Sequence, residues 1–227
     1  MFEEVPPFKD RADAGQQLAV KLEKYRGKDA VILALPRGGV AIGGEIASSL
    51  NLPLDIIPVR KIGHPFNPEY AIAALTSDGH IVLGTNELPD VDKEWLEEES
   101  KHQQLEAQRR REVYSRGRAP KKITGKIAIV VDDGLATGLT MQAAVWEIKQ
   151  KNPKKIIVAV PVAPADTAEK ISKDVDKVTT VLSPINFLGA IGAYYENFEQ
   201  VSDEQVIKII DENQNSRHAG RNQSQRP

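Results

Sequence analysis

The sequence contains no cysteine, which excludes disulfides, thiolate metal sites and cysteine nucleophiles. It also lacks any apolar run long enough to span a membrane, and its first residues, MFEEVPPFKDR, include two glutamates and no apolar stretch typical of a secretory signal. The sequence also lacks a large excess of either charge, because its 30 Lys and Arg and its 32 Asp and Glu give a formal net charge of -2. We therefore expect a cytoplasmic protein without nucleic-acid or membrane partners, in which any anion site is local.

Four short apolar runs, all rich in β-branched residues, predict strands. They are continuous rather than alternating, which is typical of parallel strands covered on both faces. The runs are 30–35, 54–59, 126–131 and 155–160, with a weaker fifth at 178–182. Helical patterns lie around and between them at 12–25, 40–50, 140–151 and 166–173. This order of elements predicts an α/β fold with a doubly wound, mostly parallel sheet in one domain.

Residues 90–118 interrupt the alternation. The segment is almost entirely polar, with acids early and bases late, an order that suits the dipole of a helix. Its apolar positions, Trp95, Leu105 and Tyr114, are too sparse for a core helix, so we expect an exposed helix inserted between strands. Residues 213–227 have no large apolar side chain and are expected to be disordered.

The run Arg109-Arg110-Arg111 within that helix could indicate nucleic-acid binding. However, Glu106 and Glu112 lie beside it, and no aromatic residues are interleaved to stack on bases. A solvated helix face is therefore the preferred interpretation.

The segment 130–140, Val-Val-Asp-Asp-Gly-Leu-Ala-Thr-Gly-Leu-Thr, places two acids at the end of a predicted buried strand. Ligands of open α/β sheets bind at that end. The loop that follows has small and hydroxyl residues, and its N–H groups and the next helix N-terminus can bind an anion. Asp132 and Asp133 would repel a phosphate, so we expect them to accept hydrogen bonds from vicinal sugar hydroxyls. A bare Asp-Asp-Gly would indicate only a strand-ending turn, whereas the whole pattern predicts a ribose 5-phosphate site.

This segment resembles the 5-phosphoribosyl 1-diphosphate (PRPP) motif of type I phosphoribosyltransferases, and is nearest to the adenine-type version. The resemblance implies that Asp132 and Asp133 bind the ribose hydroxyls. It implies that the following loop cradles the 5-phosphate, with candidate residues Gly134, Ala136, Thr137, Gly138, Leu139 and Thr140. In hypoxanthine-type relatives an aspartate that acts as a base stands at the position of Ala136, so that role does not transfer.

The family resemblance also implies a domain plan. A phosphoribosyltransferase domain of residues 1–212 would carry an inserted lid and exposed helix at about 62–118 and a small C-terminal hood at about 183–200. Aromatic residues in the glycine-rich hood could cover a planar base, although ordinary core packing explains any single one equally well.

The segment Leu35-Pro36-Arg37-Gly38-Gly39-Val40 resembles the short loop that binds diphosphate in this family. The resemblance implies that Arg37, Gly38 and Gly39 bind the diphosphate, and Arg37 can add a fork of donors. A dinucleotide-binding turn is less suitable, because the glycines do not form GxGxxG. Close helix–strand packing through glycine is the plainer alternative.

The segment from Arg60 to Tyr70 resembles the mobile loop that closes over the diphosphate in this family. Arg60 and Lys61 are candidates for neutralising charge on the leaving group, and Glu69 for a base or a ligand of magnesium-bound water. His64 could donate a hydrogen bond there or be an ordinary surface residue. Mg²⁺ is expected to bind through PRPP, with Asp132 and Asp133 as candidate ligands.

The sequence thus predicts a pentosyltransferase that moves 5-phosphoribosyl from PRPP to a nitrogen base, releases diphosphate and serves nucleotide metabolism. Two alternatives remain: a non-enzymatic PRPP-binding regulatory protein, and a hydrolase or other sugar-phosphate enzyme on the same fold. No residue identifies the base. The resemblance further implies a homodimer, because members of the family are commonly dimers.

Overall fold

The central sheet has five parallel strands in the order β2-β1-β6-β7-β8. The computed structural model describes residues 7–84 and 91–223, apart from the side chains of Glu69 and of 217–223. The strands are β1 (Ala30–Ala34), β2 (Leu54–Ile56), β6 (Ile127–Val131), β7 (Lys155–Val162) and β8 (Lys177–Leu182). All five predicted strands are confirmed. β2 ends at Ile56 rather than Val59, because the chain turns there toward a second sheet and Pro58 has no N–H to donate.

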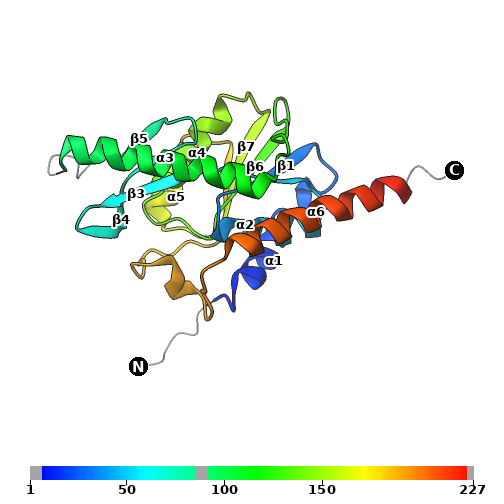
Figure 1. The fold of residues 1–227 in the computed structure, drawn as a ribbon. Helices are drawn as coiled ribbons and strands as arrows, with labels where there is room; N and C mark the ends of the chain where they lie inside the picture. Colours follow the sequence, from blue (N-terminus) through cyan, green and yellow to red (C-terminus); the bar gives the residue numbers. More distant parts are fainter. Residues whose placement is uncertain (1–6, 85–90, 224–227) are drawn as a thin grey trace.

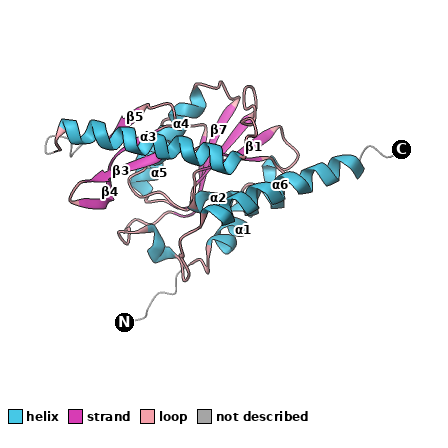
Figure 2. Ribbon diagram, viewed as in Figure 1, coloured by secondary structure: helices cyan, strands magenta, loops and turns pink. Residues whose placement is uncertain are grey.

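Helices cover both faces of this sheet, as Figures 1 and 2 show, so the predicted doubly wound α/β fold is confirmed. One face carries α1 (Arg11–Lys21), α2 (Gly38–Leu50) and α6 (Asp203–Gln223). The other carries α4 (Leu139–Lys149) and α5 (Ala165–Ser172). Short 3-10 helices follow α1 (η1, Glu23–Tyr25) and precede α6 (η3, Ile191–Tyr194).

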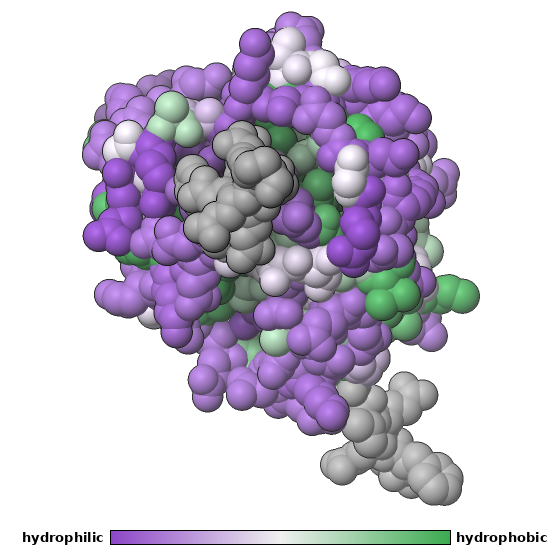
Figure 3. All heavy atoms as spheres, turned by 90° about the vertical axis from the view of Figure 1, so that its right-hand side faces the viewer, coloured by the Kyte–Doolittle hydropathy of each residue, from purple (hydrophilic) through white to green (hydrophobic). Residues whose placement is uncertain are grey.

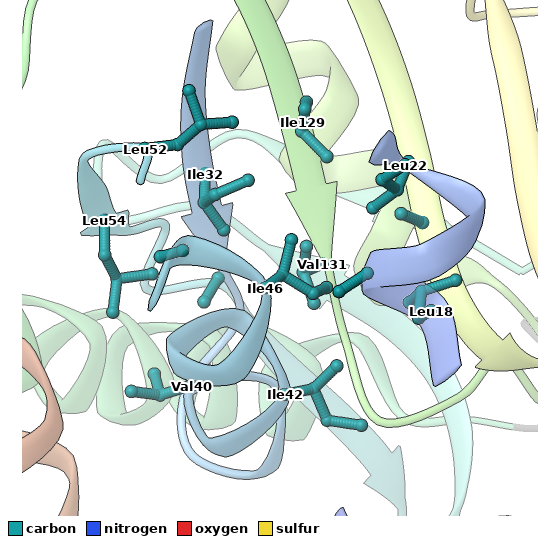
Figure 4. Close-up of a cluster of buried hydrophobic side chains, with 14 of the residues drawn as sticks. Leu18, Leu22, Ile32, Val40, Ile42, Ile46, Leu52, Leu54, Ile129 and Val131 are labelled. Carbon is teal, nitrogen blue, oxygen red and sulfur yellow. The ribbon is translucent and has the colours of Figure 1, made fainter. Parts of the chain in front are cut away.

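Alternation along the strands divides the core between the two faces. In β1, Ile32 lies in the cluster under α1 and α2, whereas Val31 lies in the cluster under α4. Figure 4 shows the first cluster, to which Leu18 of α1, Ile46 of α2 and Ile129 of β6 belong. Each fully buried aliphatic side chain of this kind stabilises the fold by roughly 1.5–3 kcal/mol relative to exposure. This packing fixes the start of α2 against the ends of β1 and β6.

A second, antiparallel sheet lies where the sequence predicts a mobile loop. Its strands, in the order β3-β4-β5, are β3 (Arg60–His64), β4 (Asn67–Leu75) and β5 (Ile81–Leu83). The segment 62–69 is therefore the turn region of a β-hairpin rather than an irregular loop. The physical reason is the apolar end of β4, where Ile72 and Leu75 are buried with Ile62 of β3.

The inserted helix α3 (Lys93–Ser115) lies across this small sheet and reaches α6 (Figure 1). The prediction of an exposed helix is wrong for its C-terminal half. Ala107, Arg110 and Tyr114 are buried there, and their three- and four-residue spacing puts them on one face. Near its start, Trp95 packs against the core of the small sheet. The inserted helix therefore joins both parts of the structure.

The expected disordered tail is wrong for residues 213–223, because α6 continues through Gln223. Asn213 is the physical reason: its side-chain oxygen accepts a hydrogen bond from the Leu54 N–H at 3.0 Å, and its amide donates to the Leu52 carbonyl at 3.2 Å. The polar tail thus caps the amino end of β2. Residues 224–227 and 1–6 lie outside the described part of the chain.

The surface toward the C-terminal end of α6 is mostly hydrophilic, with small apolar areas (Figure 3). Within the described part of the chain, each helix is too short or too polar to cross a lipid bilayer.

Candidate functional site

The two strongest sequence motifs meet at the carboxyl edge of the central sheet. β1 and β6 are hydrogen-bonded neighbours, so the turns that follow them lie together, and Leu35 N–H donates to the Val131 carbonyl at 2.9 Å. A Cβ added to Gly39 would lie 2.8 Å from the same carbonyl oxygen, and one added to Gly38 would lie 1.8 Å from Oδ2 of Asp133. Only glycine fits at these positions. Glycine-mediated close packing is therefore real here, and it occurs inside the predicted site.

Asp132 and Asp133 are partly buried beside each other. The N–H of Asp133 donates to Oδ1 of Asp132 at 2.9 Å, and the Tyr195 hydroxyl donates to the Asp133 carbonyl at 2.7 Å. Burial raises the pKa of Asp132 well above its usual range, and the charge of Asp133 raises it further. Burial also raises the pKa of Asp133, but Arg11 opposes that rise. The edge of the sheet thus holds two acids whose negative charges need a partner.

Arg11 at the start of α1 is that partner, and sequence reasoning missed it. Its Nε and Nη2 donate to Oδ2 of Asp133 at 3.0 and 2.8 Å. Its Nη1 donates to the Glu199 carbonyl at 2.7 Å, and its guanidinium lies 3.8 Å from the centroid of the Phe198 ring. Arg11 therefore connects the acid pair to the segment predicted as a hood. No local sequence pattern marks it, since it is distant from both partners along the chain.

Two tyrosines of the predicted hood belong to the core. Tyr194 and Tyr195 are 4% and 5% exposed, and the Tyr195 ring packs against Phe8 and Phe198 at centroid distances of 5.2 and 4.8 Å. The core-packing interpretation is confirmed for both. The two exposed large apolar side chains of the same segment are Ile185 and Leu188.

The loop 134–138 leads from β6 into the N-terminus of α4. Leu135 is fixed by donating its N–H to the Val162 carbonyl, and Thr167 donates its hydroxyl to the Ala136 carbonyl at 2.9 Å. Gly138 has a φ of 80°, which glycine adopts without strain, and α4 begins at the next residue. The first-turn N–H groups of a helix have no partner within it, and the helix dipole favours an anion there.

A cavity of about 290 Å³ opens at the first turn of α4, and the predicted basic residues Arg37, Arg60 and Lys61 line it. Its lining residues are Arg11, Pro36, Arg37, Gly38, Val59, Arg60, Lys61, Arg110, Thr140, Gln200 and Val201. The structure thus brings Arg37, Arg60 and Lys61 together with Thr140, at the start of α4. It adds Arg110, for which the sequence indicates a solvated helix face.

The three consecutive arginines of α3 have three different surroundings. Arg109 is half-exposed and pairs with Glu106 at 2.6 Å and Asp203 at 3.1 Å. Arg111 pairs with Asp55 at 3.2 Å, on the β2 side. Arg110 is buried in the cavity wall, so the solvated-face interpretation is wrong for it. A helix turns about 100° per residue, which is why adjacent arginines diverge.

Two other residues predicted for the site are His64, which does not line this cavity, and Glu69, whose side chain is not described. His64 lies on β3, where its Nδ1 accepts the Phe66 N–H at 3.2 Å and its ring packs against Phe66. Glu69 lies on β4, but its side chain is outside the described residues. Within residues 7–84 and 91–223 as described, His, Cys, Asp and Glu form no cluster of three or more that could hold a metal ion.

Comparison with known proteins identifies the same family along most of the chain. Residues 6–196 match the model of the phosphoribosyl transferase domain. Two proteins of Mycobacterium tuberculosis, from strains CDC 1551 / Oshkosh and ATCC 25618 / H37Rv, bear the names "Putative phosphoribosyl transferase MT0597" and "Putative phosphoribosyl transferase Rv0571c". Each is 41% identical over 206 residues, which cover 90% of this chain and 46% of the relative. The chain therefore spans a little under half the length of these relatives.

A solved structure shows the same fold over nearly its whole length. The crystal structure of the protein TT1426 from Thermus thermophilus has a TM-score of 0.73 and 39% sequence identity to this chain. The match covers 90% of this chain and 98% of that one.

Proposed function

Because the chain belongs to the family of phosphoribosyl transferase domains, we propose that it transfers 5-phosphoribosyl from PRPP to a nitrogen base and releases diphosphate. The observation that carries this proposal is the meeting of the acid pair, the loop before α4 and the glycine turn after β1 at one sheet edge. These three parts offer partners for the hydroxyls, the 5-phosphate and the diphosphate of one ligand.

Asp132 and Asp133 are proposed to accept hydrogen bonds from the ribose 2- and 3-hydroxyls. The loop 134–140 binds the 5-phosphate through its N–H groups and the hydroxyls of Thr137 and Thr140. Its position supports this role, because Ala136 and Thr137 are exposed to solvent and Thr140 lines the cavity. Along the chain the two acids come first and the anion-binding amides follow. This order matches the ligand, in which the ribose hydroxyls are followed by the 5-phosphate.

Arg37, Gly38, Gly39, Arg60 and Lys61 are proposed to bind the diphosphate. As the bond from ribose C1 to diphosphate breaks, negative charge grows on the leaving group, and fixed donors stabilise it by about 3 kcal/mol each. Mg²⁺ bound to PRPP would supply further charge neutralisation. The two carboxylates suit such an ion, because Mg²⁺ prefers one or two carboxylates together with waters and phosphate oxygens. Glu69 remains a candidate base.

A regulatory protein that binds PRPP without reacting is the second candidate. It would use the same acid pair and the same loop, and it would differ from the transferase only in the absence of a reaction. Binding and turnover must therefore be measured separately.

The test combines titration of PRPP in the presence of Mg²⁺ with an assay of diphosphate release over purines, pyrimidines and pyridine acids. We expect binding, and release with at least one base. Binding without release for any base would establish the regulatory alternative, and release without a base would establish a hydrolase. Absence of PRPP binding would refute the proposal.

Asp133→Asn tests the assignment of the acid pair. It removes a charged acceptor while keeping the shape of the side chain, so PRPP affinity should fall by about tenfold or more. Asp174→Asn is the matched control, since Asp174 is an exposed partner of Lys149 at the far end of α4. Equal PRPP affinity for the two variants would contradict the assignment.

A further inference from the structure

Among the residues that the structure describes, those bordering the cavity beside the acid pair carry more positive than negative charge. Two carboxylates are shared among three arginines: Asp203 lies 3.5 Å from Arg37 and 3.1 Å from Arg109, and Glu106 pairs with Arg109 and Arg110. Arg109 and Arg110 lower the pKa of the Glu106 carboxyl to about 2, and the hydrogen bond from Arg109 is the largest cause. Sharing leaves the guanidinium groups of this wall incompletely neutralised.

Arg60 adds to this excess. Its Nε donates to the Oε1 of Gln103 at 2.8 Å, so the acceptor of this hydrogen bond is a neutral amide of α3 rather than a carboxylate. Burial lowers the pKa of Arg60, and the nearby charge of Arg110 lowers it further. The guanidinium remains charged even so, because its usual pKa is far above neutral. A buried cation next to another cation is costly unless an anion joins them.

Two hydrogen bonds fix the Arg110 side chain in the wall of this cavity. Its Nε donates to Oε1 of Glu106 at 2.8 Å, one turn earlier on the same helix, and its Nη1 donates to the Pro36 carbonyl at 3.3 Å. Pro36 directly precedes Arg37, so Arg110 lies against the glycine turn that follows β1. Its side chain is 10% exposed, and it lines the cavity with Arg37 and Arg60.

We propose that the inserted helix α3 forms one wall of the diphosphate subsite, with Arg110 binding the diphosphate directly and Gln103 positioning Arg60 for the same purpose. This inference rests on the proposed function and extends it to a helix outside the central sheet. Arginine suits the role because its planar fork matches two phosphate oxygens at once. The ribose 5-phosphate end of the ligand lies at the loop before α4, so α3 contributes to one end of the ligand only.

The decisive variants are Arg110→Gln and Gln103→Glu, each measured by titration with PRPP, inorganic diphosphate and ribose 5-phosphate in the presence of Mg²⁺. Arg110→Gln removes a charge-assisted donor, so affinity for PRPP and for inorganic diphosphate should fall by about tenfold or more. Gln103→Glu gives Arg60 a carboxylate partner, which should weaken the same two ligands. Affinity for ribose 5-phosphate should change less than about twofold in both variants.

Arg111→Gln is the matched control, because it removes the same charge from the next residue of α3 but from the pair with Asp55. It should leave all three affinities unchanged. Gln103 is only half-buried, so its variant keeps the test valid if Arg110→Gln unfolds. A selective loss of diphosphate binding in either variant supports the inference.

Two outcomes overturn the inference: undiminished diphosphate affinity in both variants, or an equal loss for ribose 5-phosphate, which would indicate a general structural role. Failure of the proposed function looks different. In that case the wild-type chain would not bind PRPP, whereas binding of inorganic diphosphate that depends on Arg110 would still support the inference.

Discussion

Gly38 is a residue at which the requirements of the fold and of the candidate site coincide. A methyl group at this position would lie 1.8 Å from Oδ2 and 2.6 Å from Cγ of Asp133. We predict that Gly38→Ala displaces the Asp133 carboxylate from Arg11. PRPP affinity should fall by at least about tenfold, and the free energy of unfolding by about 1–3 kcal/mol, as in other overpacked sites. Ligand titration and urea denaturation measure the two effects.

Gly44→Ala is the control for this prediction, because Gly44 lies on the same helix but faces Ile209 of α6. It should leave PRPP affinity unchanged. If Gly38→Ala binds PRPP as tightly as Gly44→Ala does, the carboxylate of Asp133 is not held where the ligand needs it.

Single residues also show what sequence reasoning can and cannot reach. Asp132 and Asp133 directly follow a predicted strand, and the rule that ligands bind at strand ends was enough to make them candidates. The two turn glycines were candidates through the family resemblance. Arg11 and Arg110 reach the same place from helices far away in sequence. Their type is common on surfaces, and only tertiary packing turns them inward. Local patterns therefore find the strand-end parts of a site and miss the parts that helices contribute.

At the scale of elements, α6 ties the end of the described chain to the edge strand β2. Asn213→Ala would remove both hydrogen bonds to the buried residues Leu52 and Leu54. We predict a loss of about 1–3 kcal/mol in the free energy of unfolding, because one backbone N–H and one carbonyl lose their partners. Urea denaturation followed by circular dichroism measures it. Asn215→Ala, at an exposed position of the same helix, should change stability by less than about 0.5 kcal/mol.

The elements also differ in how well the sequence predicts them. The five parallel strands and the helices α1, α2, α4 and α5 are marked by composition and were predicted, whereas α6 was not. The hairpin β3–β4 and the burial of the C-terminal half of α3 were not predicted either, because their apolar residues are few and are recognisable as a core only when the two faces are paired. In the sequence Ile72 and Leu75 look isolated. In the structure they pack with Ile62 and Trp95 in one small core. Elements stabilised by one another, rather than by the main sheet, leave the weakest local signal.

At the scale of the whole molecule, the inserted part shares its core with the central domain. Ala74 of β4 belongs to the cluster under α4, and Tyr114 of α3 belongs to the cluster under α1 and α2. We therefore predict that both parts unfold in one equilibrium transition. The two tryptophans allow a direct measurement, because Trp95 reports the small sheet and Trp146 stacks on His80 at a centroid distance of 3.5 Å.

Single-tryptophan variants Trp95→Phe and Trp146→Phe should give urea midpoints by fluorescence that agree with each variant's own midpoint by far-UV circular dichroism. A fluorescence midpoint for Trp95 that falls clearly below the circular dichroism midpoint would show that the inserted layer unfolds by itself.

The position of Arg11 has a consequence for how the protein is made. The residues it joins are 122 and 188 positions away in the chain, at Asp133 and Glu199. A ribosome therefore finishes the first helix long before it delivers either partner, and the acid pair itself emerges while the segment that closes over it is still unsynthesised. The proposed sugar site is therefore completed only late in translation.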